Sequence, residues 1–228
     1  FAQGDSNFQT IVGDAGSLYH TSDGGTTWLS NRTQESWSSS TLSDDGTTQT
    51  AIVRGGGIYQ SVNNGLDWVE IKDSNTWLAV AMSSDGSLQM TSQSDGSTIP
   101  PTGVIGSVWQ SSDSGVTWSK DNIPNQVNHI FRQGGLAMSA DGIYRYYTYK
   151  TGVVRSDDSG VTWNNIPLYD TLDVNALGVT VSVDGRHVTV GVQNGRMQVS
   201  NDFGLSFEPK GPSAGNKVVS MSADGSMQ

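Results

Sequence analysis

The sequence predicts an all-β fold, and its composition carries that prediction. Small polar residues dominate the 228-residue chain, with 32 Ser, 20 Thr and 28 Gly, whereas Glu occurs three times and Lys five times. Long amphipathic helices are built from Glu, Lys, Ala and Leu, so there is little material for them. Seven Trp, seven Tyr and five Phe can nucleate a core, which argues against a disordered chain.

Internal repeats organise the chain. One segment, which we call the Trp box, has the pattern Ser/Thr-x-Asp-x-Gly-x-Thr-Trp and occurs at 21–28, 61–68, 111–118, 156–163 and 200–207. Its Gly permits a tight turn, its Asp accepts bonds from turn N–H groups, and its Trp packs between sheets. We expect these structural roles for Asp23, Trp28, Asn63, Trp68, Asp113, Trp118, Asp158, Trp163, Asp202 and Phe207.

A second, shorter motif alternates with the Trp box. It reads Ser-x-Asp-Gly and occurs at 43–46, 83–86, 139–142, 182–185 and 222–225, with a worn copy around Asp5. Its Asp commonly lies 17 residues after one box aromatic and 23 residues before the next, as in 28 to 45 and 45 to 68. The basic period is therefore 40 residues.

Each period is expected to hold four short strands. In the second copy, Trp77–Met82 reads as an inner strand, followed by strands over 88–92 and 108–110 and a fourth that starts at 116–118. Four strands in about 40 residues, repeated, are typical of a β-propeller blade. We expect one domain with five full four-stranded antiparallel repeats and a partial sixth, at about 1–34, 35–74, 75–124, 125–169, 170–212 and 213–228.

The partial sixth repeat has a consequence for completeness. A box aromatic placed 23 residues after Asp224 would fall beyond the last residue. A propeller with an unfinished blade exposes a strand edge, which is unfavourable. The sequence therefore favours a longer repeat protein, or a partner in a larger assembly that supplies the missing strands.

The Trp boxes resemble the Asp-box (BNR-type) repeats of propellers in the sialidase/sortilin-like superfamily. The resemblance covers essentially the whole chain and implies the fold, but not a function, because such boxes occur far from active sites. Sialidases of this kind use three Arg, a Tyr–Glu pair and an Asp. Here their (Phe/Tyr)-Arg-Ile-Pro motif fails after Phe131-Arg132, and no Glu accompanies Tyr146, Tyr147 or Tyr149, which read as strand residues on a blade surface.

Charge and residue usage exclude several function classes. A formal charge of −10 with scattered Arg argues against a nucleic-acid or anionic-membrane partner, and no apolar run is long enough to span a bilayer. The absence of Cys removes thiol catalysis and Cys-based zinc sites. His20, His129 and His187 lack the spacing of metal ligands, so we expect no metal and no cofactor.

Candidate binding residues are few. Trp37 and Trp77 hold equivalent positions six residues before a Ser-x-Asp-Gly turn, where an aromatic ring either stacks on a sugar or packs under the neighbouring blade. The insertion at 92–106 carries Ile99, Pro100 and Pro101, which suit a protein contact or belong to a neutral insertion. Asn31 begins the one Asn-x-Ser/Thr sequon and is a candidate glycan site.

These features favour a non-enzymatic binding or structural module, secreted or at the cell surface, with a protein or glycan partner. We expect no catalytic residues, because turn positions account for nearly all of the 19 Asp. The alternative is a carbohydrate-active propeller, either a lectin or a glycosidase or sialidase-like hydrolase, since a glycosidase needs only two suitably spaced carboxylates.

Overall fold

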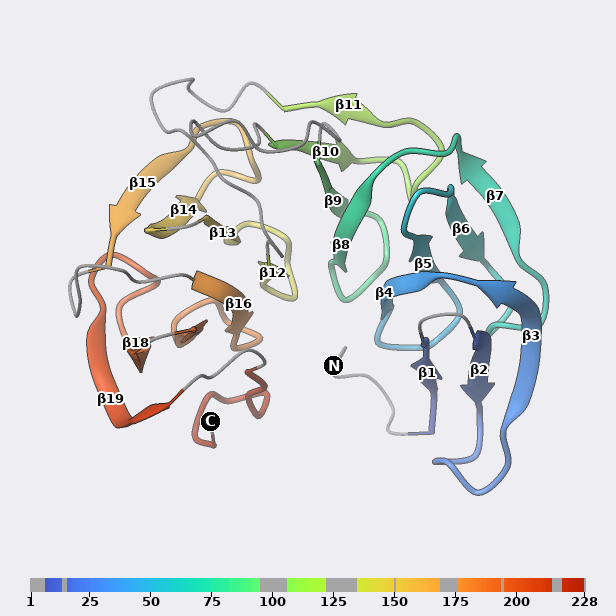
Figure 1. Cartoon of the computed structure of the whole chain (residues 1–228), viewed down its shortest axis with the longest axis horizontal. Helices are drawn as coiled ribbons and strands as arrows, with labels where there is room; N and C mark the ends of the chain where they lie inside the picture. The colour runs from blue at the N-terminus through green and yellow to red at the C-terminus, as the bar shows by residue number, and fades with distance from the viewer. Residues whose placement is uncertain are drawn as a thin grey trace. The chain divides into compact units, whose positions relative to one another are not determined.

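The computed structural model describes residues 7–13, 16–94, 106–121, 135–149, 151–168, 176–193, 195–214 and 219–227. Within these ranges the chain consists of antiparallel strands and turns (Figure 1). No helix in them is long and apolar enough to cross a membrane. The strands belong to two compact units, one with β1 to β11 and the other with β12 to β19.

The first unit holds three antiparallel sheets, each ordered as its strands follow in the chain. The first sheet has three described strands: β1 (Gln9–Ile11), β2 (Gly16–Thr21) and β3 (Leu29–Glu35). The second comprises β4 (Trp37–Leu42), β5 (Gln49–Val53), β6 (Ile58–Ser61) and β7 (Val69–Lys72). The third comprises β8 (Trp77–Met82), β9 (Gln89–Ser94), β10 (Gly106–Ser111) and β11 (Ser119–Lys120).

The second unit holds two four-stranded sheets. One comprises β12 (Leu136–Met138), β13 (Arg145–Tyr149), β14 (Gly152–Ser156) and β15 (Asn164–Pro167). The other comprises β16 (Ala176–Val181), β17 (Val188–Val192), β18 (Gly195–Ser200) and β19 (Glu208–Ala214).

The all-β class is confirmed, and four of the five described sheets have the four antiparallel strands expected of a repeat. The inner strand expected at Trp77–Met82 is β8. The strand expected at the start of the first repeat, around Phe1-Ala2, lies outside the described residues. In the partial sixth repeat, the described residues 219–227 form a turn and no strand.

In the first unit, the first strand of a sheet packs on the sheet before it. Trp37 of β4 joins Leu18 of β2 in one buried cluster and meets Tyr59 edge to face, with ring centroids 5.5 Å apart. Trp77 of β8 joins Ile52 of β5 in a second cluster. Such edge-to-face contacts add to the free energy of burying large rings.

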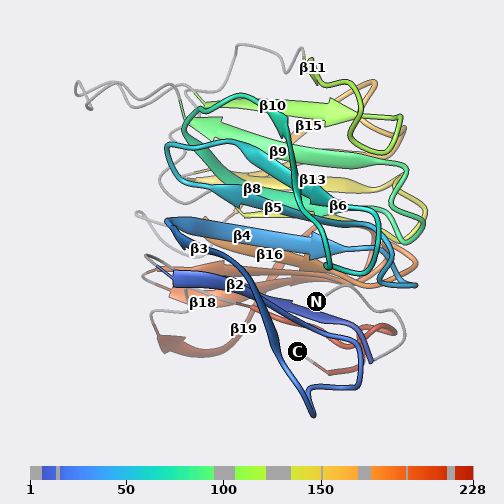
Figure 2. The ribbon, with the colours of Figure 1, turned by 90° about the vertical axis from the view of Figure 1, so that its right-hand side faces the viewer.

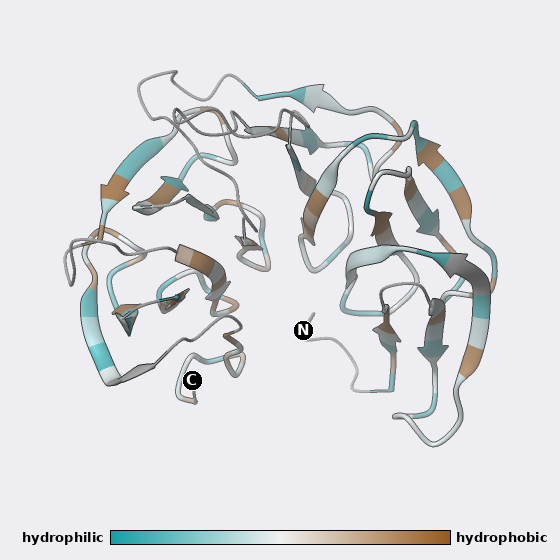
Figure 3. Ribbon diagram, in the orientation of Figure 1, coloured by the Kyte–Doolittle hydropathy of each residue, from teal (hydrophilic) through white to brown (hydrophobic). Residues whose placement is uncertain are grey.

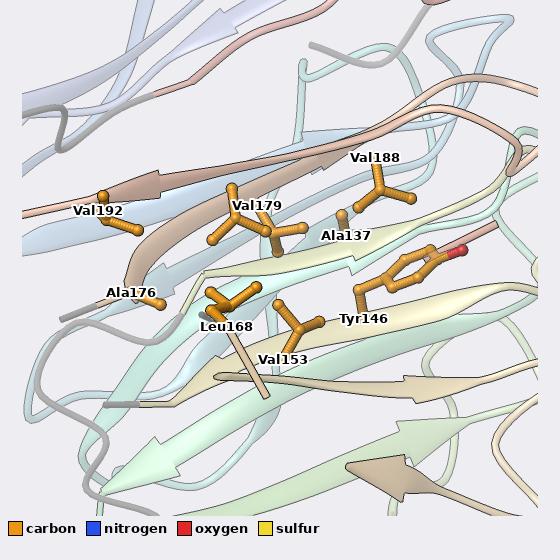
Figure 4. Packing of buried hydrophobic residues seen from close by; sticks show 9 residues of the cluster. Ala137, Tyr146, Val153, Leu168, Ala176, Val179, Val188 and Val192 are labelled. Atoms are coloured by element: carbon orange, nitrogen blue, oxygen red, sulfur yellow. The ribbon is translucent and has the colours of Figure 1, made fainter. Parts of the chain in front are cut away.

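In the second unit, the core lies between the two sheets. Val153 and Tyr146 of the β12–β15 sheet pack with Val179 of β16 and Val188 of β17 (Figure 4). All five residues of β17 are buried, and β16 is coloured mostly hydrophobic in Figure 3. β-Branched side chains suit such doubly covered strands because they pack well on a pleated surface.

Candidate functional site

The two sequence motifs meet at one end of each described four-stranded sheet, which we call the turn end. The Ser-x-Asp-Gly turn joins a sheet's first two strands and the Trp box joins its last two, as between β4 and β5 and between β6 and β7. In the side view the strands run across the picture and turns project from their ends (Figure 2). Backbone bonds tie the two motifs together, for example from Asn64 N to Thr47 O at 3.2 Å and from Ser114 N to Ser87 O at 2.9 Å.

Each Trp box is held by its own side chains. In the third copy, Ser111 Oγ donates to Asp113 Oδ1 at 2.8 Å and accepts a bond from Gly115 N at 2.8 Å. The Asp113 carboxylate also accepts bonds from Thr117 N and Thr117 Oγ. The same bonds recur in the boxes of Asp23, Asp158 and Asp202.

The second box forms the same turn with different side chains at positions three and seven, Asn63 and Asp67. Asn63 Oδ1 takes the place of the carboxylate oxygen and accepts bonds from Ser61 Oγ and Asp67 N, both at 2.9 Å. Asn63 Nδ2 then donates to Asp67 Oδ2. The hydroxyl donor and carboxylate acceptor of the other boxes are therefore replaced by an amide donor at position three and a carboxylate at position seven.

The backbone of the Trp box has positive φ at two positions, not one. The Gly in position five, which was expected to permit the tight turn, has positive φ, for example 88° at Gly115. The fourth position also lies in the left-handed region, at Gly24, Asn64, Ser114, Ser159 and Phe203. A non-Gly residue there carries a steric cost of about 1–2 kcal/mol.

The box Trp side chains differ in burial, which corrects the expectation that all four are mostly buried. Trp163 is 7% exposed, packs edge to face on Tyr147 and donates Nε1 to Asp121 Oδ2. The other three are only half-buried, and each donates Nε1 to the carbonyl of the Gly in its own box. These are Trp28, Trp68 and Trp118.

The Ser-x-Asp-Gly turns bond to one another through the backbone. Asp44 N donates to Ser84 O at 2.7 Å in the first unit, and Val183 N donates to Ala223 O at 2.9 Å in the second. Their Gly residues lie against the preceding sheet. A Cβ on Gly46, whose φ is 70°, would lie 2.2 Å from Phe8 Cγ. Any side chain there would force the neighbouring sheet away.

Side chains that flank one box contact the next box along. Asn31 Nδ2 donates to Gly65 O and to Leu66 O, and Gln60 Nε2 donates to Ser114 O at 2.9 Å. The Asn31 amide nitrogen, to which a glycan would be attached, is thus already used in a contact between sheets. This geometry weighs against the glycan site expected at Asn31.

The turn bonds set the acidity of the carboxylates. The hydroxyl and N–H of Thr27, with the hydroxyl of Thr21, lower the pKa of Asp23 to about 2. Bonds from Thr117 likewise lower the pKa of Asp113. Burial and the neighbouring Asp45 charge raise the pKa of Asp44. The carboxylates of Asp23 and Asp113 therefore serve their own turns.

The structure decides the two aromatic binding candidates, Trp37 and Trp77. Trp37 is 3% exposed and Trp77 is 1% exposed, so neither ring can stack on a sugar at the surface. The packing alternative holds for both, because an inner strand pressed on the preceding sheet buries its first aromatic residue. Ile99, Pro100 and Pro101 lie outside the described residues.

The tyrosines expected on a blade surface are buried instead. Tyr146 and Tyr147 are fully buried, and burial raises the pKa of both hydroxyls, which disfavours a phenolate nucleophile. The expectation failed because β13 is covered on both faces. Arg145 is also buried and donates Nε to Gly142 O. In the described part of the chain, no three His, Asp or Glu side chains are grouped to hold a metal ion.

One surface feature was missed at the sequence level. Position six of the Trp box is aliphatic in four of five copies, and the side chain is exposed each time: Leu66 58%, Val116 76%, Val161 80% and Leu205 59%. Alignment of the five boxes would have found this signal, since tight turns normally favour Gly, Asn, Asp and Ser.

Comparisons with known proteins concern the fold. No family model and no curated protein sequence matches the chain. Among solved structures, an ancestral GH74 enzyme is similar with a TM-score of 0.73 at 13% identity, over 95% of this chain and 31% of that enzyme. TolB from Acinetobacter baumannii is similar with a TM-score of 0.68 at 12% identity, over 96% of this chain and 56% of TolB. The chain thus spans well under two thirds of both proteins, and it has the β-propeller fold that they share.

Proposed function

We propose that the protein is a non-enzymatic binding or scaffold module that acts outside the cell or at its surface. The use of the turn-end carboxylates carries this proposal. Asp113 and Asp85 each accept bonds from a Ser hydroxyl and from a backbone N–H of their own turn. Carboxylates engaged in this way build rigid turns, whereas a glycosidase needs two that converge on a substrate.

The rigid turns leave other positions free for recognition. The self-contained bonds of the Trp box use positions one, three, five and seven, so the side chains at positions two and six can vary without loss of the turn. We assign these boxes to the Asp-box (BNR-type) repeats of sialidase-like propellers, in which a common scaffold carries many functions. Protein or glycan recognition by exposed turn side chains suits such a scaffold.

The test combines activity and binding on the purified chain. We expect no hydrolysis of sialosides or aryl-glycosides above that of a heat-unfolded control, and saturable binding in a glycan array or in a pull-down from the native source. Sustained turnover of either substrate by the folded chain would overturn the proposal.

One observation favours a carbohydrate-binding alternative. Trp109 of β10 is half-buried, donates Nε1 to Gln93 Oε1 at 2.7 Å, and has the Lys72 ammonium 4.4 Å from its ring centroid. A half-buried aromatic ring with an ammonium over it and an amide bonded at its edge combines the apolar and polar groups that line small-molecule sites. A glycan-array signal that Trp109→Ala abolishes, without loss of folding, would favour a lectin.

A further inference from the structure

Three aliphatic side chains at the turn end of the first unit lack a role in the fold. Val62 is 71% exposed, Leu66 is 58% exposed and Val116 is 76% exposed, so none of them belongs to a core. They occupy positions two and six of the second and third Trp boxes, which the bonds of the box leave free. Single exposed aliphatic residues are ordinary, whereas exposed aliphatic groups gathered on neighbouring turns are a feature of interaction surfaces.

The boxes that carry these residues are neighbours in space. Asn31, three residues after the first box, bonds the second box, and Gln60, one residue before the second box, bonds the third. Because each box is tied to the next, the boxes that carry the three aliphatic side chains lie next to each other at the turn end. We call the turns 21–28, 43–48, 61–68, 83–88 and 111–118 the acidic turn surface.

The charge of this surface has a single sign. Its five turns contain no Lys, Arg or His, and they contain six carboxylates: Asp23, Asp44, Asp45, Asp67, Asp85 and Asp113. Arg54 lies between β5 and β6, at the opposite end of its sheet. Exposed aliphatic groups are therefore surrounded by negative charge, with no basic residue of these turns to neutralise it.

We infer that the acidic turn surface docks a cationic segment of a partner protein, in which Lys or Arg residues are interspersed with aliphatic ones. The inference rests on the proposed binding function and names its partner chemistry. Positive side chains would meet the turn carboxylates, while aliphatic ones would cover Val62, Leu66 and Val116. A second copy of this chain, with a formal charge of −10, would be repelled, as would a nucleic acid or an anionic membrane.

The experiment uses the intact chain and three short labelled peptides of equal length. One contains Lys, Leu and Ser, the second replaces each Leu by Ser, and the third replaces each Lys by Glu. Fluorescence anisotropy should show that the Lys/Leu/Ser peptide binds about fivefold or more tighter than the second, with no binding of the third and weaker binding at high salt.

Matched variants locate the contact. The triple variant Val62→Ser, Leu66→Ser, Val116→Ser should lose about fivefold or more in affinity for the Lys/Leu/Ser peptide, because three apolar contacts are removed. Ile11→Ser removes a 52% exposed aliphatic side chain at the opposite end of its strand pair, and should leave the affinity unchanged. Likewise Asp44→Asn should weaken binding, and Asp73→Asn, at an exposed position between β7 and β8, should not. Since these side chains are exposed, apart from the half-buried Asp44, thermal melts should show folded variants.

The outcomes separate the two proposals. Equal affinity for the two Lys peptides, or a triple variant that binds normally, would show non-specific attraction and overturn the inference. A native partner whose binding ignores the triple variant would overturn the inference and leave the binding function standing. Glycoside turnover without any protein binding would overturn both.

Discussion

The two kinds of turn at the turn end use the same local chemistry but are held in place differently. In both, a Ser or Thr hydroxyl donates to the Asp carboxylate, which also accepts a bond from a backbone N–H. That N–H belongs to the residue two positions after the Asp in the Ser-x-Asp-Gly turn, and four positions after it in the Trp box. The Ser-x-Asp-Gly turns bond to each other through the backbone and press Gly46 on the preceding sheet. The Trp boxes are tied to their neighbours by side chains such as Asn31 and Gln60.

This difference decides where the sequence can vary. A turn that contacts its neighbour by backbone and by a Gly without room for Cβ admits few replacements. A turn held by its own hydroxyl and carboxylate, and anchored by one aromatic ring, can carry many side chains at its free positions. Recognition is therefore expected at the Trp boxes and structural constraint at the Ser-x-Asp-Gly turns.

The largest effect is expected from the aromatic anchor of the box. Trp163→Ala should lower the free energy of unfolding by about 3–5 kcal/mol, because it empties a buried site against Tyr147. Trp118→Ala should cost at least about 1 kcal/mol less, because the half-buried ring loses less apolar contact. Urea denaturation of both variants measures the difference. Equal losses would mean that burial of the ring does not set the strength of the anchor.

The next effect separates crowding from backbone strain. Gly46→Ala should cost about 2–4 kcal/mol, since a Cβ collides with Phe8 and φ is positive. Gly24→Ala, at the same φ of 70° but with its nearest atom 3.8 Å away, should cost about 1 kcal/mol. Thermal unfolding compares the pair. A similar cost at both sites would remove the special constraint on the Ser-x-Asp-Gly turn.

The pH dependence of stability should differ between two carboxylates of the acidic turn surface. The folded-state pKa of Asp23 is lowered from 3.8 to about 2, so its turn bonds stabilise the folded protein above pH 4 and are lost between about pH 4 and pH 2. The pKa of Asp44 is raised by burial and by Asp45, so its ionisation destabilises the folded protein. Asp23→Asn should flatten the acid limb of the stability curve, and Asp44→Asn should not reduce stability at pH 7. Denaturant titrations from pH 6 to pH 2 measure the free energy of unfolding of both variants. The same pH dependence in both would contradict the prediction.

The smallest effect probes the left-handed fourth position of the box. Ser114→Gly should raise the free energy of unfolding by less than about 1 kcal/mol. The reason is that relief of the backbone strain at φ 58° outweighs the added freedom of the unfolded chain. Ser112→Gly, two residues earlier and outside the positive-φ set, should instead destabilise by about 0.5–1 kcal/mol. The melting temperature is expected to rise in Ser114→Gly and to fall in Ser112→Gly. A loss at both positions would show that the strain at Ser114 is negligible.

Sequence reasoning predicted the strands and turns more accurately than the site. The alternation of Trp box and Ser-x-Asp-Gly turn predicted where the chain turns between described strands, because Gly, Asp and Ser act within a few residues of their own position. The same reasoning left Trp37 and Trp77 undecided between exposure and burial. Their environment is made by the preceding sheet through Leu18 and Ile52, about 20–25 residues away in sequence.

The sequence by itself determined the all-β class, the 40-residue period and the chemistry of both turns, since hydrogen bonds over two to four residues need only local neighbours. Tertiary structure decided which turns share one end of a sheet, which rings are covered, and that Asn31 serves the next box. It also placed side by side, in the acidic turn surface, the turns of separate repeats that carry six Asp and three exposed aliphatic residues. No local pattern encodes that surface, because it arises only when each sheet packs on the one before it and aligns the turns of both.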